Sequence, residues 1–301
     1  MSFTEGAAIR TLRQDACMNE DSMRGSFTHD PGEYLNRVGD FLRMMPVEHN
    51  VLLSNAARRA RREQINEADL WLWVEAGSEV VAAALHTPPH GAYLSTGPSE
   101  AMRLMAQMLW EQRPWLAGVA GPTPSPEDFA DEWVSLGGPP AVLESREGTY
   151  IASRVDARAD VLGALRIAEH RDADLLRAWA TEFMAETGLT TSDEDLVGPR
   201  IEAGRMFVWE VDGQAVAMAA VTDAHGGVSR VHLVFTPPQN RKRGFASACV
   251  AAITSRELAN PGRLCMLYTD VENPTSNKIY QEVGYRRVGD TVQLRFPQRR
   301  Q

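Results

Sequence analysis

Residues 234–246 read VFTPPQNRKRGFA, and this stretch decides how we expect the second half of the chain to fold. A β-rich run ends at Thr236, where two prolines stop it because proline cannot donate to a sheet ladder. A short loop follows, with three consecutive basic residues at 241–243. Small residues then open an amphipathic segment, so the pattern predicts a strand at about 229–235 and a helix at about 244–258.

The start of that helix has the properties of a phosphate-binding site. A helix N-terminus offers unpaired N–H groups and the positive end of the helix dipole. Gly244 and Ala246 would let a phosphate approach the backbone closely. Arg241, Lys242 and Arg243 add local positive charge to a chain that is acidic overall. From these residues alone, a surface turn with solvated charges is an equal alternative.

A second informative stretch, residues 268–285, reads YTDVENPTSNKIYQEVGY. The pattern predicts a strand at about 263–270, a helix at about 275–283 and a last strand pair at about 285–296. The run Arg241-Lys242-Arg243-Gly244-Phe245-Ala246 resembles the acetyl-CoA loop of the GNAT superfamily of N-acetyltransferases, Arg/Gln-x-x-Gly-x-Gly/Ala. The second stretch resembles the strand–Asn–helix–Tyr–Gly-aromatic element of that superfamily, and the resemblance spans residues 164–296.

The resemblance implies an enzyme that transfers an acetyl group to a primary amine of a small molecule, an amino acid or a peptide N-terminus. Acetyl-CoA would be the cosubstrate, its pyrophosphate held by loop amides and its thioester and pantetheine arm held by backbone groups of residues 234–236. Asn273 would either contact that arm or serve only as the residue at the helix entry. The cofactor-binding candidates are Val234, Phe235, Thr236, Arg241, Lys242, Arg243, Gly244, Phe245, Ala246, Ser247 and Asn273.

The same resemblance assigns catalysis to the second half of the chain, by direct attack of the amine on the thioester. Tyr280 would be the general acid that protonates the leaving thiolate, although by spacing alone it reads as a core tyrosine at a helix end. His232 is a candidate general base, because an imidazole titrates near neutral pH. Glu210 is a second candidate, and ordered water is the alternative to both.

Two segments of the chain resemble each other at an offset of 135 residues, which predicts a duplicated domain. The segments 71–84 and 206–219 both read as strand, turn and strand. We therefore expect an α/β protein of tandem GNAT-like folds, each a mixed, mostly antiparallel sheet flanked by helices. Residues 29–155 would be a degenerate GNAT-like domain and residues 156–301 the catalytic domain, with residues 1–28 a disordered leader.

The first domain departs from the family pattern at both motifs, so catalysis is expected in the second lobe of a two-lobed bacterial type. The region that matches the loop runs from Ser95 to Glu100 and has no Arg-x-x-Gly-x-Gly. Trp133 stands where Tyr280 would be.

Composition narrows the classes of partner. The 301 residues carry a net charge of −9, which disfavours nucleic acid and anionic membranes as partners. No apolar run is long enough to cross a membrane. Three cysteines and an N-terminus without a signal pattern favour a cytoplasmic protein. No metal-binding motif occurs. His86 and His90 are four residues apart, but the two prolines between them exclude the helix that would pair them as metal ligands.

Three points stay open at this level. The amine acceptor is not identified, and a homodimer is compatible with the sequence. The alternative function is a non-catalytic protein in which bound acyl-CoA acts as a regulatory or interaction ligand.

Overall fold

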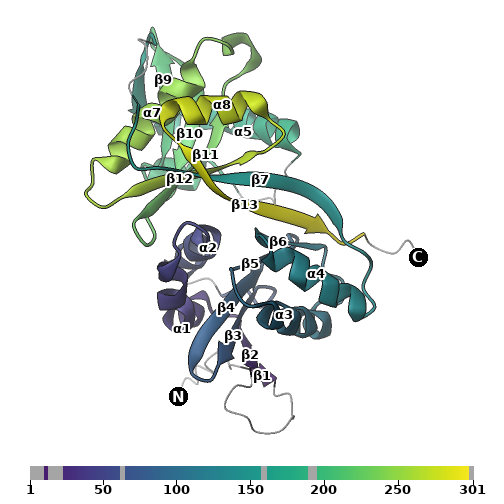
Figure 1. Ribbon diagram of the computed structural model, residues 1–301. Helices are drawn as coiled ribbons and strands as arrows, with labels where there is room; N and C mark the ends of the chain where they lie inside the picture. Colours follow the sequence, from purple (N-terminus) through teal and green to yellow (C-terminus); the bar gives the residue numbers. More distant parts are fainter. Residues whose placement is uncertain (1–9, 13–22, 62–64, 157–160, 189–194, 298–301) are drawn as a thin grey trace, which may run out of the picture. The chain divides into compact units, whose positions relative to one another are not determined.

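The computed structural model describes residues 10–12, 23–61, 65–156, 161–188 and 195–297 (Figure 1). The chain forms two compact units. The first consists of Met1–Glu147 together with Gly289–Gln301, and the second of Gly148–Val288. The boundary predicted from the sequence, 155/156, lies beyond the observed division at Glu147/Gly148, and residues 157–160 lie outside the described part.

The first unit is a mixed sheet with helices on both faces. Its elements are β1 (Arg10–Leu12), β2 (Met23–Thr28), α1 (Pro31–Met44), α2 (Asn50–Arg61), β3 (Leu70–Ala76), β4 (Glu79–His86), β5 (Ala92–Leu94), α3 (Ser99–Gln112), β6 (Gly118–Pro122), α4 (Ser125–Ser135) and the start of β7 (Val142–Ala152). The strand order begins β1-β2-β3-β4-β5-β6, and only β5 and β6 run parallel among these pairs.

Alternation along β3 explains why both faces of this sheet are covered. Trp71 and Trp73 point to the side of α1 and α2, whereas Leu70 and Leu72 point to the side of α3 and α4. All four side chains are buried. Figure 1 shows the two helix pairs on opposite sides of β3 and β4.

The predicted disordered leader is wrong for residues 23–28. Met23–Thr28 forms strand β2, which pairs antiparallel with β3. Phe27 is buried in the core between the sheet and α3. Residues 10–12 form β1 beside it, and residues 1–9 and 13–22 lie outside the described residues.

The end of the chain also differs from expectation. The sequence predicted a strand pair at 285–296 within the second domain, but the structure has one long strand, β13 (Arg286–Arg295). Its residues 291–295 pair antiparallel with β6 of the first unit. Val292, Leu294 and Phe296 are buried in that unit's core, and Phe296 stacks on Trp133 at 5.0 Å between ring centroids.

From β8 to β12, the second unit repeats the strand pairing of β2 to β6 in the first. Its elements are the end of β7, β8 (Ala164–Ile167), a 3-10 turn η1 (His170–Asp172), α5 (Ala173–Thr187), α6 (Gly198–Glu202), β9 (Met206–Val211), β10 (Gln214–Val221), β11 (Val228–Phe235), a 3-10 turn η2 (Pro238–Asn240), α7 (Phe245–Leu258), β12 (Leu264–Asp270) and α8 (Pro274–Val283). The order is β7-β12-β11-β10-β9-β8, with β11 and β12 parallel. The predicted fold class, a mostly antiparallel mixed sheet flanked by helices, is confirmed.

A matching ion pair supports the internal repeat. In the first unit, Arg24 of β2 donates to Glu75 of β3 at 2.6 Å. In the second unit, Arg166 of β8 donates to Glu210 of β9 at 2.5 Å. The 135-residue offset aligns Glu75 with Glu210. Each of these carboxylates therefore pairs with an arginine on the neighbouring strand.

Helices cover both faces of the second sheet. α7 packs on one face, where Phe245, Cys249 and Ile253 meet β9–β12. α5 and α6 pack on the other face, around Leu176 and Trp179. Within the described residues, no helix combines the length and the hydropathy that a membrane crossing requires.

A buried carboxylate fastens the far end of α7. Glu257 is 2% exposed and accepts from Arg205 Nη1 at 3.0 Å, Arg263 Nη1 at 3.1 Å and Ser229 Oγ at 2.9 Å. Glu257→Gln removes the charge that compensates two guanidinium groups, and we expect the free energy of unfolding to fall by about 2 kcal/mol. Urea unfolding followed by circular dichroism measures this, and a loss below about 0.5 kcal/mol would contradict it.

Candidate functional site

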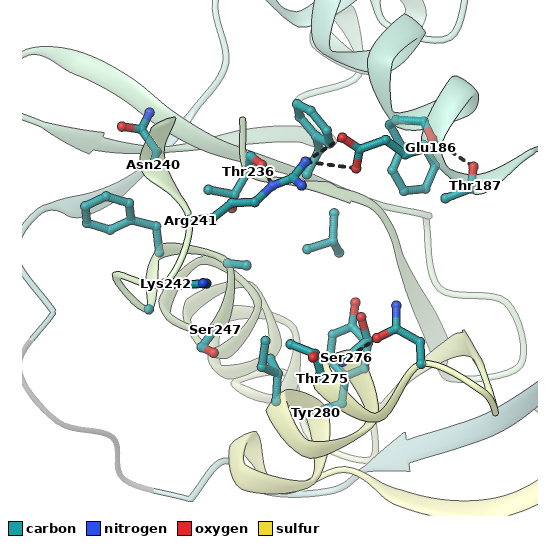
Figure 2. Close-up of a pocket in the computed structure, with 18 residues that line it drawn as sticks. Glu186, Thr187, Thr236, Asn240, Arg241, Lys242, Ser247, Thr275, Ser276 and Tyr280 are labelled. Atoms are coloured by element: carbon teal, nitrogen blue, oxygen red, sulfur yellow. Dashed lines mark hydrogen bonds and ion pairs between the residues drawn. The ribbon is translucent and has the colours of Figure 1, made fainter. Parts of the chain in front are cut away.

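The second unit contains a cavity of about 450 Å³ bordered by α5, the end of β11, the 236–244 loop, α7 and α8 (Figure 2). Of the residues predicted from sequence, the structure places these at its wall: Val234, Phe235, Thr236, Arg241, Lys242, Gly244, Phe245, Ala246, Ser247, Asn273 and Tyr280. The two sequence stretches, more than twenty residues apart along the chain, therefore meet around one space.

A bulge in β11 shapes the first wall. Met218 pairs with Phe235 and Ala220 with His232, so β11 has one more residue than β10 between these two pairs. Leu233 has a φ of 51°, a conformation that a branched side chain rarely adopts. As a result, Val231 packs on the α7 face but Leu233 and Phe235 pack on the α5 face.

β11 and β12 part just before this bulge. Their parallel ladder joins Val228 to Leu264 and ends at Arg230, opposite Met266. No further ladder pair links these two strands within the described residues. Residues 234 and 235, at the strand end that reaches the cavity, therefore have no ladder partner in β12.

The 236–244 loop delivers the chain to the first turn of α7. Gly244 is the N-cap residue with a φ of 79°, and no side chain caps the amides of that turn. Lys242 also has a positive φ, 62°. A Cβ atom on Gly244 would lie 3.2 Å from Val161 Cγ2. The uncapped amides form a concave donor surface of the kind that binds anions.

The three basic side chains of the loop have different surroundings. Arg241 forms an ion pair with Glu186 of α5, with Nη2 at 2.6 and 2.8 Å from the two carboxylate oxygens. Lys242 lines the cavity. Arg243 lies over the ring of Phe245, with its guanidinium carbon 4.7 Å from the ring centroid, and it is not part of the wall.

Helix α8 supplies the wall that carries Tyr280. Asn273 caps this helix, because its side chain accepts from the Ser276 amide at 3.1 Å, and it also lines the cavity. Figure 2 shows Tyr280, Thr275 and Ser276 on the side of the cavity opposite the Arg241–Glu186 pair. Burial raises the pKa of Tyr280 to about 12, so the phenol is a neutral hydrogen-bond donor at physiological pH.

Neither candidate base lines this cavity. His232 lies in β11 opposite Ala220, which packs on the α5 face of the sheet. Glu210 is paired with Arg166, which also donates to Asp172 at 2.7 and 2.9 Å. The Arg166 hydrogen bonds lower the pKa of Asp172, and the three residues tie β8, β9 and the start of α5 together.

Sequence reasoning missed part of the wall. The additional residues are Phe183, Glu186, Thr187, Asn240, Thr275, Ser276 and Ile279. Nothing in the sequence marks Glu186, whose partner Arg241 is 55 residues away. Among the described residues, no cluster of three or more His, Cys, Asp or Glu side chains could hold a metal ion.

The first unit has the corresponding elements, α3 and α4, with different local surroundings. Its α3 is also uncapped, but the first turn carries the acidic Glu100. A Cβ on Gly97 would lie 2.8 Å from the Val81 carbonyl oxygen, so backbone closely covers this turn. Trp133 is 1% exposed and stacks in the core.

Comparison with known proteins adds two findings. Residues 211–294 match the FR47-like protein family. No curated protein matches the chain in sequence.

Several solved structures are similar over almost the whole chain. An acetyltransferase of the GNAT family from Colwellia psychrerythraea shares 15% identity, with a TM-score of 0.55 over 96% of this chain and 100% of that one. A GCN5-related N-acetyltransferase from Sphaerobacter thermophilus shares 14%, with a TM-score of 0.57 over 94% and 98%. A tandem GNAT protein from the clavulanic acid biosynthesis pathway shares 13%, with a TM-score of 0.52 over 86% and 94%. At these identities the likeness is one of fold.

Proposed function

This chain has the GNAT fold and an FR47-like segment at residues 211–294, and from that premise we propose that its second unit transfers an acetyl group from acetyl-CoA to a primary amine. The acceptor is an amine of a small molecule, an amino acid or a peptide N-terminus. One observation carries the proposal: an uncapped helix start, a strand end freed from its neighbour and a neutral tyrosine surround a single cavity.

The donor would be bound from both ends of the cavity. The amides of the first turn of α7 and the side chain of Lys242 would hold the diphosphate, because both present positive charge to it. Backbone groups of residues 234–236 would hydrogen-bond the pantetheine arm and the thioester oxygen. A preorganised donor to that oxygen is worth roughly 3 kcal/mol in the transition state.

The chemistry is a direct displacement. The nitrogen lone pair of the amine attacks the thioester carbonyl carbon, an N–C bond forms and the C–S bond breaks. Tyr280 gives its phenolic proton to the departing thiolate and regains a proton from solvent. The proton lost by the amine goes to water, since neither His232 nor Glu210 lines the cavity.

The alternative, a non-catalytic acyl-CoA sensor, is less well supported. A sensor needs the anion-binding helix start but has no need for a phenol in the same cavity. Tyr280 lines the cavity in its protonated form, which favours the enzyme.

Acetyl-CoA binding and turnover test the proposal together. Acetyl-CoA at 100 times its dissociation constant should stabilise the native state by about 2.7 kcal/mol, seen as a raised Tm. A panel of primary amines, assayed by release of free thiol, should contain at least one that is acetylated. No shift in Tm would refute donor binding, and a clear shift with no thiol release across the panel would favour the sensor.

A further inference from the structure

The guanidinium of Arg241 is already engaged on several sides. Its Nη2 donates to both oxygens of Glu186, and its Nε donates to the carbonyl oxygen of Thr236 at 2.9 Å. Its carbon lies 5.7 Å from the ring centroid of Phe235. These contacts join three elements: the last turn of α5, the end of β11 and the 236–244 loop. Figure 2 shows the paired side chains at the edge of the cavity.

The pair changes what Arg241 offers to an anionic donor. The contact of Nη2 with both carboxylate oxygens is a charge-assisted pair with a net charge of zero. Positive charge for the diphosphate then comes from the uncapped amides of α7 and from Lys242, whose side chain lines the same cavity. Glu186 and Arg241 both line the cavity as well, so their contact sets the position of two parts of its wall.

We propose that Glu186 is a positioning residue for donor binding: through Arg241 it clasps the last turn of α5 to the 236–244 loop and holds that loop in its anion-binding shape. This inference rests on the proposed function, since it concerns the same cavity. The opposing possibility is that Arg241 binds the diphosphate itself and that Glu186 competes for it. The two possibilities predict effects of opposite sign when Glu186 loses its charge.

Coenzyme A affinity of Glu186→Gln, measured by isothermal titration calorimetry, distinguishes them. The clasp predicts binding about threefold weaker than that of the control, as expected for loss of an ion pair that is about half exposed. Glu182→Gln is the matched control, because Glu182 is an exposed residue one turn earlier on the same helix and its substitution changes the net charge equally. Affinity equal to or tighter than that of Glu182→Gln would overturn the clasp.

A second experiment exchanges the charges of Glu186 and Arg241. Arg241→Glu alone should weaken coenzyme A binding tenfold or more, because it places two carboxylates together at the loop. The double variant Glu186→Arg/Arg241→Glu restores the pair in reverse and should recover affinity to within about threefold of the wild type. A double variant as weak as Arg241→Glu would mean that Arg241 acts on the diphosphate directly.

The outcomes separate this inference from the function on which it rests. A wild-type protein that does not bind coenzyme A would refute the proposed function. Wild-type binding with an unaffected Glu186→Gln variant would leave that function standing and remove the clasp alone.

Discussion

Gly244→Val should lower the affinity for coenzyme A by about 100-fold or more and abolish the rise in Tm caused by acetyl-CoA. Gly244 has a φ of 79°, which a β-branched residue adopts only at a cost. Its new Cβ would lie 3.2 Å from Val161, and the two methyl groups would cover amides of the first turn of α7. A loss of 100-fold corresponds to about 2.7 kcal/mol of binding free energy. Titration calorimetry and thermal unfolding measure the two effects.

Gly213→Val is the control for backbone strain. Gly213 lies in the hairpin between β9 and β10 with a φ of 77°, and no atom lies within 4 Å of its would-be Cβ. Both variants should lose stability, but only the variant at 244 should lose the ligand. Equal coenzyme A affinities of the two variants would remove the loop from the donor site.

Tyr280→Phe should lower kcat by about 100-fold and change the affinity for coenzyme A by less than about twofold, since it removes an acid that acts only when the thiolate leaves. Its pKa of about 12 keeps the phenol protonated in the enzyme. The protonated form is the active one and is lost only as pH rises through that value. Wild-type turnover should therefore show no tyrosine-dependent fall below about pH 11. Steady-state rates across pH, with the acceptor found in the amine panel, measure both effects.

Tyr285→Phe is a matched control five residues further along the chain. Tyr285 is buried, shares a 2.8 Å hydrogen bond with the Thr254 hydroxyl and does not line the cavity. Its loss should cost about 1 kcal/mol of stability and leave kcat unchanged. The same kcat in both phenylalanine variants would remove Tyr280 from the chemistry.

Local signals in the sequence were sufficient to predict the end of β11 and the helices α7 and α8, which border the cavity. Two prolines marked the end of β11, and small residues after the basic run marked the start of α7, which the structure places at Phe245. The helix predicted at 275–283 is α8, Pro274–Val283. Each of these features depends on residues within one turn or one strand of each other, so no knowledge of tertiary contacts was needed.

Features that depend on distant residues were not predictable in this way. Glu186 and Arg241 are separated by 55 residues, and an acidic residue near the end of an amphipathic helix is ordinary. The positive φ of Leu233 has no sequence marker, because glycine would be expected there. Likewise, the alternation in β13 shows that one side of the strand is buried but not which sheet it joins.

The course of β13 has a consequence for how the protein is made. The first unit needs Val292, Leu294 and Phe296 to complete its core, and these residues follow the whole second unit in the sequence. Its β6 edge and the ring of Trp133 must therefore stay uncovered while the whole second unit is synthesised. This chain therefore cannot fold vectorially, with each domain complete before the next one emerges. The second unit can complete its core before the first.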